Sequence, residues 1–355
     1  MKLSFKNTYN NKRVLITGAT GFKGSWLSIW LHSLGSDVLG FSLEPITERD
    51  NYVVCGLENK INHIAANIEN FKKLCDVINN FKPHFIFHLA AQPLVINSYK
   101  DPISTYNTNV NGTLNILEAI RKTDFVSVGI IVTSDKCYEI NNSKVSYKET
   151  DPLGGIDPYS ASKAVCEIIT NSYIKSYFSI KGSPNIASVR AGNVIGGGDW
   201  AENRIVPDCI KSIENGKPIM LRNPQATRPW QHVLEPLSGY LTLGKVLYEK
   251  GKKYQSAWNF GPKLNDSKSV EDVAKAIIKY LGNGNISYEN FEEEYKESIL
   301  LAIDIQKSKK FLDWNPKLSF DEAIKLTVDE YNIKSLTTDQ IYRQRLEHIL
   351  YYCGK

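Results

Sequence analysis

Residues 14–24 read Val-Leu-Ile-Thr-Gly-Ala-Thr-Gly-Phe-Lys-Gly, and this stretch decides the fold. A short run typical of a buried strand leads directly into a glycine turn spaced G-x-x-G-x-x-G, and a helical pattern follows. The first glycine permits a tight turn, the second lets a pyrophosphate approach the backbone, and the third lets the helix pack against the strand. A glycine turn without a ligand is the alternative, but the order of the elements favours a dinucleotide site. Its predicted residues are Gly18, Thr20, Gly21, Phe22, Lys23 and Gly24.

Short apolar runs alternate with helical patterns through the first 195 residues. The runs are Val14 to Thr17, Asp37 to Phe41, Phe85 to Ala91, Gly129 to Thr133, and Ile186 to Arg190. Such alternation predicts a Rossmann-type, doubly wound parallel sheet, an α/β fold. We therefore predict a dinucleotide-binding domain over residues 1–195. Residues 196–355 are predicted to be a smaller, mostly helical substrate lobe, with some segments returning to the first domain.

Composition narrows the class of protein. The chain has 355 residues, enough for about two domains, and its net charge is +5 with no basic run, which argues against nucleic-acid binding. We find neither a signal-peptide pattern nor an apolar run of membrane-spanning length, and we expect no membrane partner. The six cysteines form no C-x-x-C pair, so we expect no metal site and a reducing, cytoplasmic location.

The second strand bears on which dinucleotide binds. Ser42 stands where an acidic residue commonly selects NAD, Glu44 follows two residues later, and the nearest arginine is Arg49. Because no arginine lies close enough to favour a 2′-phosphate, we predict NAD rather than NADP. Asn67 and Ile68, after the third presumed strand, are candidates for the adenine, although they could simply end that strand.

Tyr159 and Lys163 lie four residues apart, so on a helix they share one face. An ammonium beside a phenol lowers the pKa of the phenol, and the phenolate can then take a proton from a substrate hydroxyl. The pair alone is common and usually faces solvent. Upstream, however, Ser134-Asp135-Lys136 follows a buried-looking strand, where a hydroxyl could bridge substrate and tyrosine.

Together these motifs resemble the extended short-chain dehydrogenase/reductase family. The resemblance spans nearly the whole chain and also rests on His88-Leu89-Ala90-Ala91, on Asn107 to Gly112 and on Arg190 to Gly196. It implies a nucleotide-sugar substrate under the C-terminal lobe, with nicotinamide facing Tyr159. His88 itself we interpret as a packed core residue.

The triplet Ser134-Asp135-Lys136 resembles the 4,6-dehydratase branch of this family, and Gly197 to Trp200 with Arg228 to Val233 resemble the members that act on CDP-glucose. That resemblance implies oxidation at C4, loss of water across C5 and C6, and return of hydride to C6. Tyr159 would act as base at C4 and Asp135 as acid at C6. Lys136 could be the C5 base, a hydrogen-bond partner of Asp135, or a stabiliser of the enolate, and the sequence leaves these roles open.

Further site residues are predicted because their positions match those of the family or because their side chains suit the ligand. Leu89, Ala90 and Ala91 are expected beside the cofactor, together with Tyr159 and Lys163. Guanidinium groups suit phosphate oxygens, which makes arginines candidates for the substrate pyrophosphate. The predicted substrate-binding residues are Gln92, Ser98, Asn193, Arg204, Arg228, His232 and Asn259.

The helix after Asp101 and the helix from Tyr159 carry apolar residues on more than one face. In the family these helices pair with their copies, which implies a homodimer or a higher homo-oligomer; burial within one chain is the alternative. Two other functions stay open. One is a 4-epimerase or a dehydratase for another nucleotide, and the other is a non-catalytic module that binds NAD or a sugar nucleotide.

Overall fold

The computed structural model describes residues 5–141, 146–263, 267–288 and 302–355, and its centre is a seven-stranded sheet in the order β11-β6-β5-β4-β1-β2-β3. All six strand pairings are parallel. The strands are β1 (Arg13–Thr17), β2 (Asp37–Ser42), β3 (Asn62–Ala65), β4 (Phe85–His88), β5 (Val128–Val132), β6 (Asn185–Arg190) and β11 (Ala257–Asn259). The predicted doubly wound parallel sheet is confirmed, and its seventh strand, β11, was not predicted.

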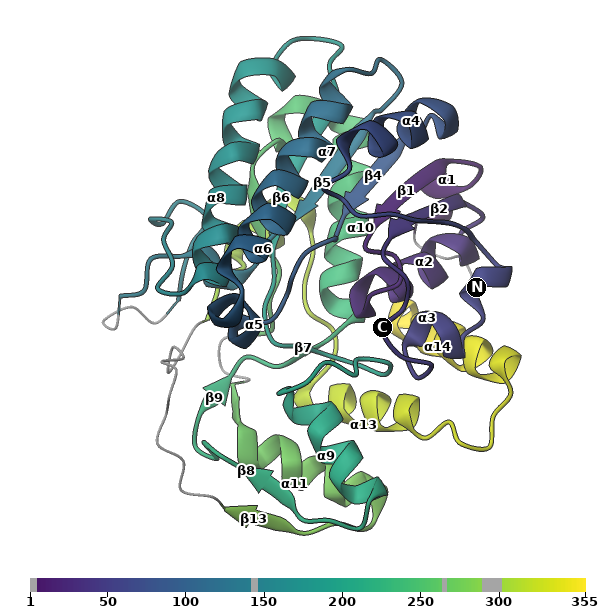
Figure 1. Ribbon diagram of the computed structural model, residues 1–355, viewed down its shortest axis with the longest axis vertical. Helices are drawn as coiled ribbons and strands as arrows, with labels where there is room; N and C mark the ends of the chain where they lie inside the picture. Colours follow the sequence, from purple (N-terminus) through teal and green to yellow (C-terminus); the bar gives the residue numbers. More distant parts are fainter. Residues whose placement is uncertain (1–4, 142–145, 264–266, 289–301) are drawn as a thin grey trace.

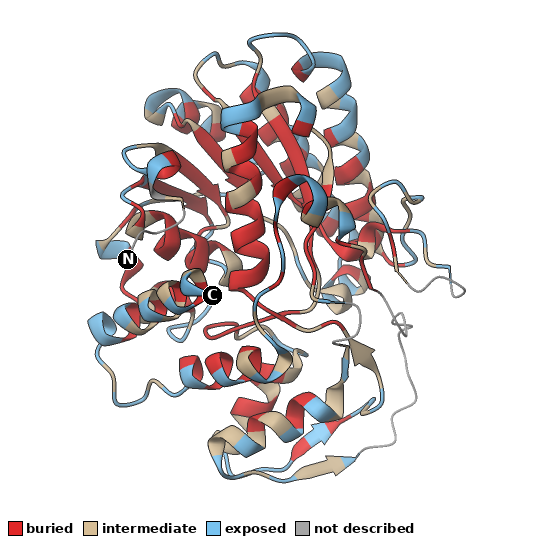
Figure 2. Cartoon of the chain, turned by 180° about the vertical axis from the view of Figure 1, so that it is seen from behind, coloured by how far each residue is buried: buried red, intermediate tan, exposed pale blue. Residues whose placement is uncertain are grey.

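Neighbouring residues of a strand face opposite sides of the sheet, and this alternation explains the two helical layers. In β1, Val14 and Ile16 join a core cluster with α2 (Phe22–Ser33), α10 (Leu234–Lys250) and α14 (Thr338–Gly354). Leu15 joins the opposite cluster, with α4 (Phe71–Phe81) and α7 (Gly112–Arg121). Figures 1 and 2 show these layers, with buried strands between helices whose outer faces are exposed. Helix α8 (Pro158–Tyr173) stands beside α7.

Local sequence signals mark several helix ends. Gly35, with a φ of +83°, comes just after α2, and Gly282, with a φ of +77°, caps the end of α11 (Val270–Leu281). Ser269 begins α11 with a capping box, and Ser319 begins α13 (Phe320–Tyr331) in the same way. These local signals therefore determine where the helices begin and end.

A smaller, mostly helical part lies below the sheet in Figure 1. Its core joins α9 (Ile205–Glu214), α11 and α13 to a pair of parallel strands, β8 (Ile219–Leu221) and β13 (Ile286–Tyr288). Two further short pairs are β7 (Val194–Ile195) with β10 (Gln231–His232), and β9 (Thr227–Arg228) with β12 (Lys268–Ser269). Segments after residue 195 thus lie in both parts of the molecule, and the exact domain boundary stays a prediction.

The remaining elements are short. The α-helices are α1 (Lys6–Tyr9), α3 (Asn51–Val54), α5 (Val95–Lys100), α6 (Pro102–Tyr106) and α12 (Gln306–Leu312). Single turns of other helix types are η1 (Leu57–Asn59), η2 (Asn107–Asn111), η3 (Asp135–Cys137), η4 (Ile174–Phe178) and η5 (Gly251–Tyr254). Over the described ranges, no helix combines the length and apolar character needed to cross a bilayer.

Candidate active site

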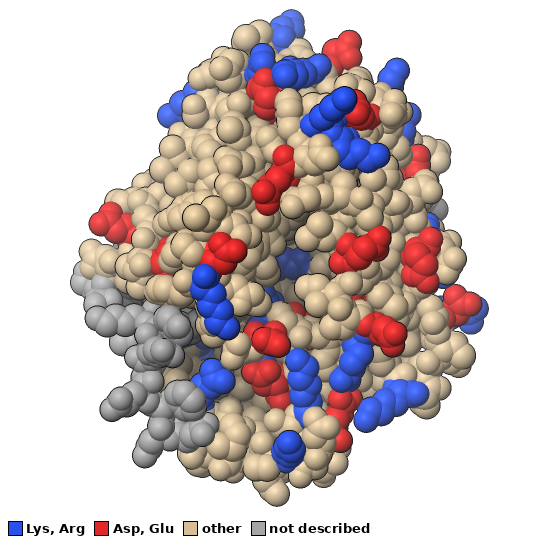
Figure 3. Space-filling view, viewed as in Figure 1, with Lys and Arg blue, Asp and Glu red and all other residues tan. Residues whose placement is uncertain are grey.

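Parallel strands end at the same edge of the sheet, and the loops that follow β1, β4, β5 and β6 meet there. On the face shown in Figure 3 the surface is hollowed between the sheet domain and the smaller part, with Lys or Arg atoms inside the hollow. Most of the predicted site residues come from these loops and from the start of α8. The cleft is therefore the place where their side chains can act together.

The triplet Ser134-Asp135-Lys136 follows β5 and forms the turn η3. The Ser134 hydroxyl donates to Asp135 Oδ1 at 3.0 Å and accepts from the Lys136 N–H at 3.2 Å. The other carboxyl oxygen of Asp135 packs against Gly192, where the Cβ of any other residue would lie 1.7 Å from it. A glycine at position 192 is thus required for this placement of the acid.

Burial raises the pKa of the Asp135 carboxyl above its ordinary value. The charges of Lys136 and Lys23 and the hydrogen bond from Ser134 oppose this shift without cancelling it. A carboxyl held toward its protonated form can donate a proton, which is the property expected of a general acid.

Tyr159 and Lys163 lie on α8, which begins at a cap formed by Asp157. Burial raises the pKa of Tyr159 to about 12, and a hydrogen bond with Ser134 lowers it in part. Burial also lowers the pKa of Lys163, whose ammonium donates to the Val132 carbonyl at 3.4 Å. Ser134 thus interacts with both Asp135 and Tyr159, and Lys163 lies one turn after Tyr159 on α8.

A buried polar layer that sequence reasoning missed lies beneath these groups. Glu167 accepts hydrogen bonds from Thr133 at 2.5 Å, from Ser188 at 2.7 Å and from Arg190 at 2.8 Å. Burial alone would raise the pKa of Glu167, but the Arg190 charge and these hydrogen bonds hold it below its ordinary value. The layer fixes α8 to the ends of β5 and β6. Its sequence signal was the spacing Tyr159-Lys163-Glu167, three successive turns of one helix face.

The glycine turn has the geometry of an anion cradle. Gly18 has a φ of +73°, and a Cβ there would lie 2.8 Å from the Ala90 nitrogen. Gly21 precedes α2 without a side-chain cap, so the first N–H groups of the helix remain for an anion. Thr20 donates to the Leu43 carbonyl at 2.8 Å and to Ser42 at 3.2 Å. These features fit a dinucleotide pyrophosphate.

The other predicted cofactor residues line the same edge. The Thr17 hydroxyl accepts from the N–H groups of Leu89 and Ala90, both at 3.2 Å. Leu89, Ala90 and Ala91 are each half-buried just after β4, whereas Asn67 is exposed and Ile68 is buried against Gly112. His88 is buried and hydrogen-bonded to Thr17 at 2.7 Å, as predicted for a core residue.

The predicted substrate residues lie in different settings. Gln92 is half-buried and bonds Thr105, and Ser98 is buried and bonds the Val95 carbonyl. Asn193 is half-buried with a φ of +51°, and Arg228 is half-buried in β9.

Arg204 donates to Asp199 at 2.6 Å, and the Tyr159 phenol is within reach of its charge. Although burial opposes its charge, Asp199 raises the pKa of Arg204. Asn193, Arg204 and Arg228 therefore keep their predicted roles as hypotheses.

Two of these predictions place buried structural residues in the substrate site. All three hydrogen bonds of the Asn259 amide are made inside the protein, from Tyr138 at 2.8 Å, to the Tyr147 carbonyl at 2.9 Å and to the Asp304 carbonyl at 3.1 Å. The His232 ring is fully buried and bonds Glu330 at 3.1 Å. Each side chain is hydrogen-bonded in the interior, and a role of Asn259 or His232 in substrate binding stays a prediction.

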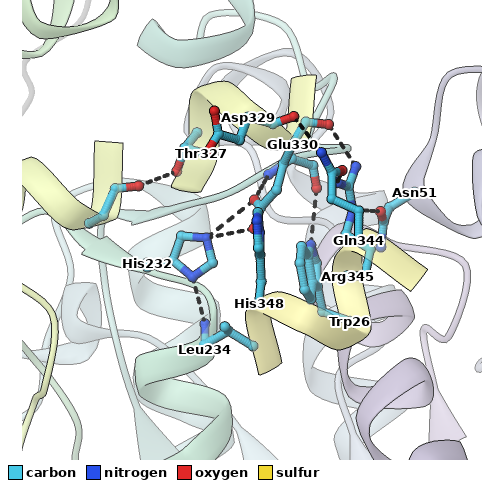
Figure 4. A network of polar contacts seen from close by, with 12 residues as sticks. Trp26, Asn51, His232, Leu234, Thr327, Asp329, Glu330, Gln344, Arg345 and His348 are labelled. Atoms are coloured by element: carbon cyan, nitrogen blue, oxygen red, sulfur yellow. Dashed lines mark hydrogen bonds and ion pairs between the residues drawn. The ribbon is translucent and has the colours of Figure 1, made fainter. Parts of the chain in front are cut away.

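Figure 4 shows the network that holds His232. The Glu330 carboxylate, at the end of α13, accepts from His232, from His348 of α14 at 2.8 Å and from the Gly197 N–H at 2.6 Å. The Trp26 indole of α2 donates to the Gly197 carbonyl at 3.0 Å. One buried carboxylate thus joins the glycine-rich loop after β7, strand β10 and the C-terminal helix.

Comparison with known proteins agrees with this geometry. Residues 15–327 match the sequence family described as GDP-mannose 4,6 dehydratase. The chain belongs to this family, and its resemblance to the extended short-chain dehydrogenases/reductases is confirmed.

Among its relatives, the CDP-glucose 4,6-dehydratase of Salmonella typhimurium is 41% identical over 323 residues, which cover 90% of each chain. A dTDP-glucose 4,6-dehydratase from Bacillus anthracis, solved in complex with NAD, is 26% identical with a TM-score of 0.75, covering 91% of this chain and 97% of that one. The epimerase Mth375 of Methanothermobacter thermautotrophicus shares the fold, with 22% identity, a TM-score of 0.79, and coverage of 98% of this chain and 97% of that one.

Removal of the Glu330 carboxylate is expected to destabilise the protein. Glu330→Ala leaves two histidines and a buried N–H without their acceptor, and we expect a loss of about 3–5 kcal/mol in the free energy of unfolding. Chemical denaturation measures this loss. Burial alone would raise the pKa of Glu330, but the charges of His232 and His348 and their hydrogen bonds hold it below its ordinary value. Its contribution is therefore complete above about pH 4.3 and declines as the pH falls further.

Glu347→Gln provides the control, because Glu347 is exposed on the same helix as His348. We expect it to change the unfolding free energy by less than about 0.5 kcal/mol. Equal stabilities of Glu330→Ala and Glu347→Gln would show that the network contributes nothing to the fold.

Proposed function

We propose that this protein is a cytoplasmic, NAD-dependent sugar-nucleotide 4,6-dehydratase that converts CDP-D-glucose to CDP-4-keto-6-deoxy-D-glucose. The observation that carries the proposal is the buried Asp135, whose raised pKa suits an acid, beside Ser134 and Tyr159. The similarity to a CDP-glucose 4,6-dehydratase over 90% of the chain supports both the reaction and the nucleotide. Six cysteines without disulfides suit the reducing cytoplasm.

The residues present fit NAD as the resident cofactor. The turn from Gly18 to Gly24, with Thr20 and Ser42, would hold its adenosine half and pyrophosphate, and Tyr159 and Lys163 would stand at its nicotinamide. The similar dTDP-glucose 4,6-dehydratase was solved with NAD. When bound, NAD accepts two electrons from C4 of the sugar and returns them to C6, so the overall reaction involves no net redox change.

The chain's own side chains supply the proton transfers. Tyr159, as phenolate, takes the proton of the C4 hydroxyl, and both Ser134 and the Lys163 charge favour that phenolate. The ketone formed at C4 acidifies the proton on C5. Asp135 then donates its proton to the departing C6 hydroxyl, which leaves as water. These reaction steps require a closed cleft, because bulk water must be kept away from the unsaturated intermediate.

Asp135 separates this function from the nearest rival, a 4-epimerase. Epimerisation at C4 needs no acid for a C6 leaving group, whereas the dehydratase reaction does. A module that binds sugar nucleotides without turnover would have no use for a tyrosine and a lysine buried near a carboxyl of raised pKa. The buried pair Ser134 and Tyr159 therefore favours an enzyme.

Mass spectrometry of sugar nucleotides incubated with the purified protein tests the function. We expect CDP-glucose to lose one water, and dTDP-, UDP- and GDP-hexoses to react more slowly or not at all. Loss of water from another nucleotide sugar instead would keep the reaction and change the substrate. No loss of water from any of them would refute the dehydratase, and ligand-dependent melting without a product would then indicate a binding module.

Tyr159→Phe removes the phenol and is expected to lower kcat by about a hundred- to ten-thousand-fold, as for loss of a general base. Ser134→Ala removes the hydrogen bond that lowers the pKa of Tyr159, so the acidic limb of the pH–rate profile should move to higher pH. Steady-state kinetics across pH measure both effects. Tyr288→Phe, at an exposed tyrosine of the smaller part, is the control and should act like the wild type. A Tyr159→Phe variant with near-normal kcat would remove Tyr159 from the mechanism.

We also propose a homodimer formed through α6, α7 and α8. Large apolar side chains are exposed along these adjacent helices, including Ile103 (74% exposed) in α6 and Ile168 (56% exposed) in α8. Exposed apolar patches of this kind commonly mark protein–protein contacts, and homodimers are the most frequent assembly. The continuous helical segment from α6 to α7 and the helix α8 of each copy would then form a four-helix bundle.

Light scattering should give twice the chain mass of 40.1 kDa. Ile168→Glu buries a charge in the proposed contact and should yield the monomer, whereas Met220→Glu, at an exposed residue of β8, should leave the dimer intact. A wild-type monomer would contradict the proposal.

A further inference from the structure

Arg49, the arginine nearest to the end of β2, binds a carboxylate of the smaller part. Its terminal nitrogen Nη2 donates to both carboxylate oxygens of Glu214, at 2.9 Å each, and Glu214 is the last residue of α9. The guanidinium also lies over the indole of Trp200, with its central carbon 3.4 Å from the ring centre. The Trp200 indole N–H in turn donates to the Arg49 carbonyl at 2.8 Å. These contacts join the loop after β2 to the chain after residue 195.

The contacts of Arg49 exceed those of an ordinary surface ion pair. An isolated ion pair on a protein surface contributes little, because water screens it and two long side chains must be ordered. Here one guanidinium is held both by a carboxylate and by an aromatic face, and an indole N–H binds the backbone of the same residue. Glu214 is only 20% exposed, so its charge is partly shielded from solvent. The contact is therefore able to hold the two segments in one arrangement.

The loop that presents Arg49 begins beside the glycine turn. Thr20 of that turn donates to the carbonyl of Leu43, the first residue after β2, at 2.8 Å. Asp50 closes the loop, since its carboxylate accepts from the N–H of Ile46 at 2.8 Å. Arg49 thus has a defined place on the side of the cleft where the adenosine half of the dinucleotide is predicted.

The segment that receives these contacts runs from β7 to α9 and leads to a predicted substrate residue, Arg204. Asp199, the chain neighbour of Trp200, accepts from Arg204 at 2.6 Å. Gly198 packs against the start of α3, where a Cβ at position 198 would lie 2.8 Å from the Cα of Asn51. Backbone packing and side-chain contacts therefore join the substrate side of the cleft to the loop after β2 at two neighbouring places.

We propose that Arg49 is a positioning residue, which holds the loop after β2 and the segment before α9 together and so sets the substrate site against the cofactor site. The inference rests on the proposed function, because NAD and a sugar nucleotide are the two ligands concerned. Hydride transfer needs the sugar and the nicotinamide at a fixed separation. Without Arg49 the two segments can separate, and each ligand must order them when it binds, which weakens the binding of both. Once both ligands are bound, the site is complete and the chemical steps are little changed.

Arg49→Met removes the charge and its hydrogen bonds and keeps an unbranched side chain. We expect the dissociation constants of NAD and of CDP each to rise by about tenfold, because part of the binding free energy is then spent on ordering the two segments. The KM for CDP-glucose should rise by a similar factor, while kcat at saturation stays within about twofold of the wild type. Calorimetric titration measures the binding of each ligand, and steady-state kinetics separate KM from kcat.

Glu214→Gln removes the charge of the partner and should weaken both ligands in the same direction. The double variant should bind them no more weakly than Arg49→Met, because the two residues act as one pair. Lys334 stays 3.6 Å from Glu214, so Arg49→Met leaves that carboxylate with a partner and should fold. Lys279→Met is the matched control: Lys279 forms an exposed ion pair with Asp321 at 3.4 Å within the smaller part, and its loss should leave both affinities unchanged.

Three results would overturn the inference. They are wild-type affinities for NAD and CDP in Arg49→Met, a lower kcat in Arg49→Met with both affinities unchanged, and equal weakening of both ligands in Lys279→Met. The binding measurements do not depend on turnover. A wild type that binds NAD and CDP but dehydrates no sugar nucleotide would therefore refute the proposed function and not the role of Arg49.

Discussion

The contact between the glycine turn and the neighbouring backbone is the constraint on which the other parts of the site depend. A Cβ at Gly24 would lie 2.0 Å from the Gly18 carbonyl oxygen, and one at Gly18 would lie 2.8 Å from the Ala90 nitrogen. Any larger residue would push α2 away from β1 and β4. The first turn of α2 carries the free N–H groups for a pyrophosphate, and its Phe22 ring packs against Gly196 in the loop after β7. One close approach therefore shapes the cofactor cradle and sets where α2 meets β4 and the loop after β7.

Burial is the common cause behind the chemistry of the cleft. It moves the pKa of Asp135 and Tyr159 up and that of Lys163 and Lys23 down, in each case toward the neutral form. For Asp135 this shift suits the role of an acid, whereas for Tyr159 burial opposes the phenolate, which the hydrogen bond with Ser134 favours. The buried Glu167–Arg190 pair beneath them stays charged, because each partner compensates the other.

The features that could be predicted from the sequence are those that a few adjacent residues determine. Strand β1, the caps of α11 and α13, and the Tyr159–Lys163 spacing could all be predicted because a few adjacent residues determine them. The interior hydrogen bonds of Asn259 and His232 could not be predicted, because their partners, such as Glu330, come from distant segments of the chain. Strand β11 was missed for a similar reason: three residues carry little periodicity, and only pairing with β6 makes them a strand.

The central claim is that oxidation at C4 and reduction at C6 occur within one substrate molecule held in this cleft. CDP-glucose with deuterium at C4 tests it most directly, with the product analysed by mass and by NMR. The account predicts a product that has lost one water and carries the deuterium at C6, with no exchange between labelled and unlabelled molecules in a mixture. A dehydrated product without deuterium, or with deuterium transferred between molecules, would contradict it.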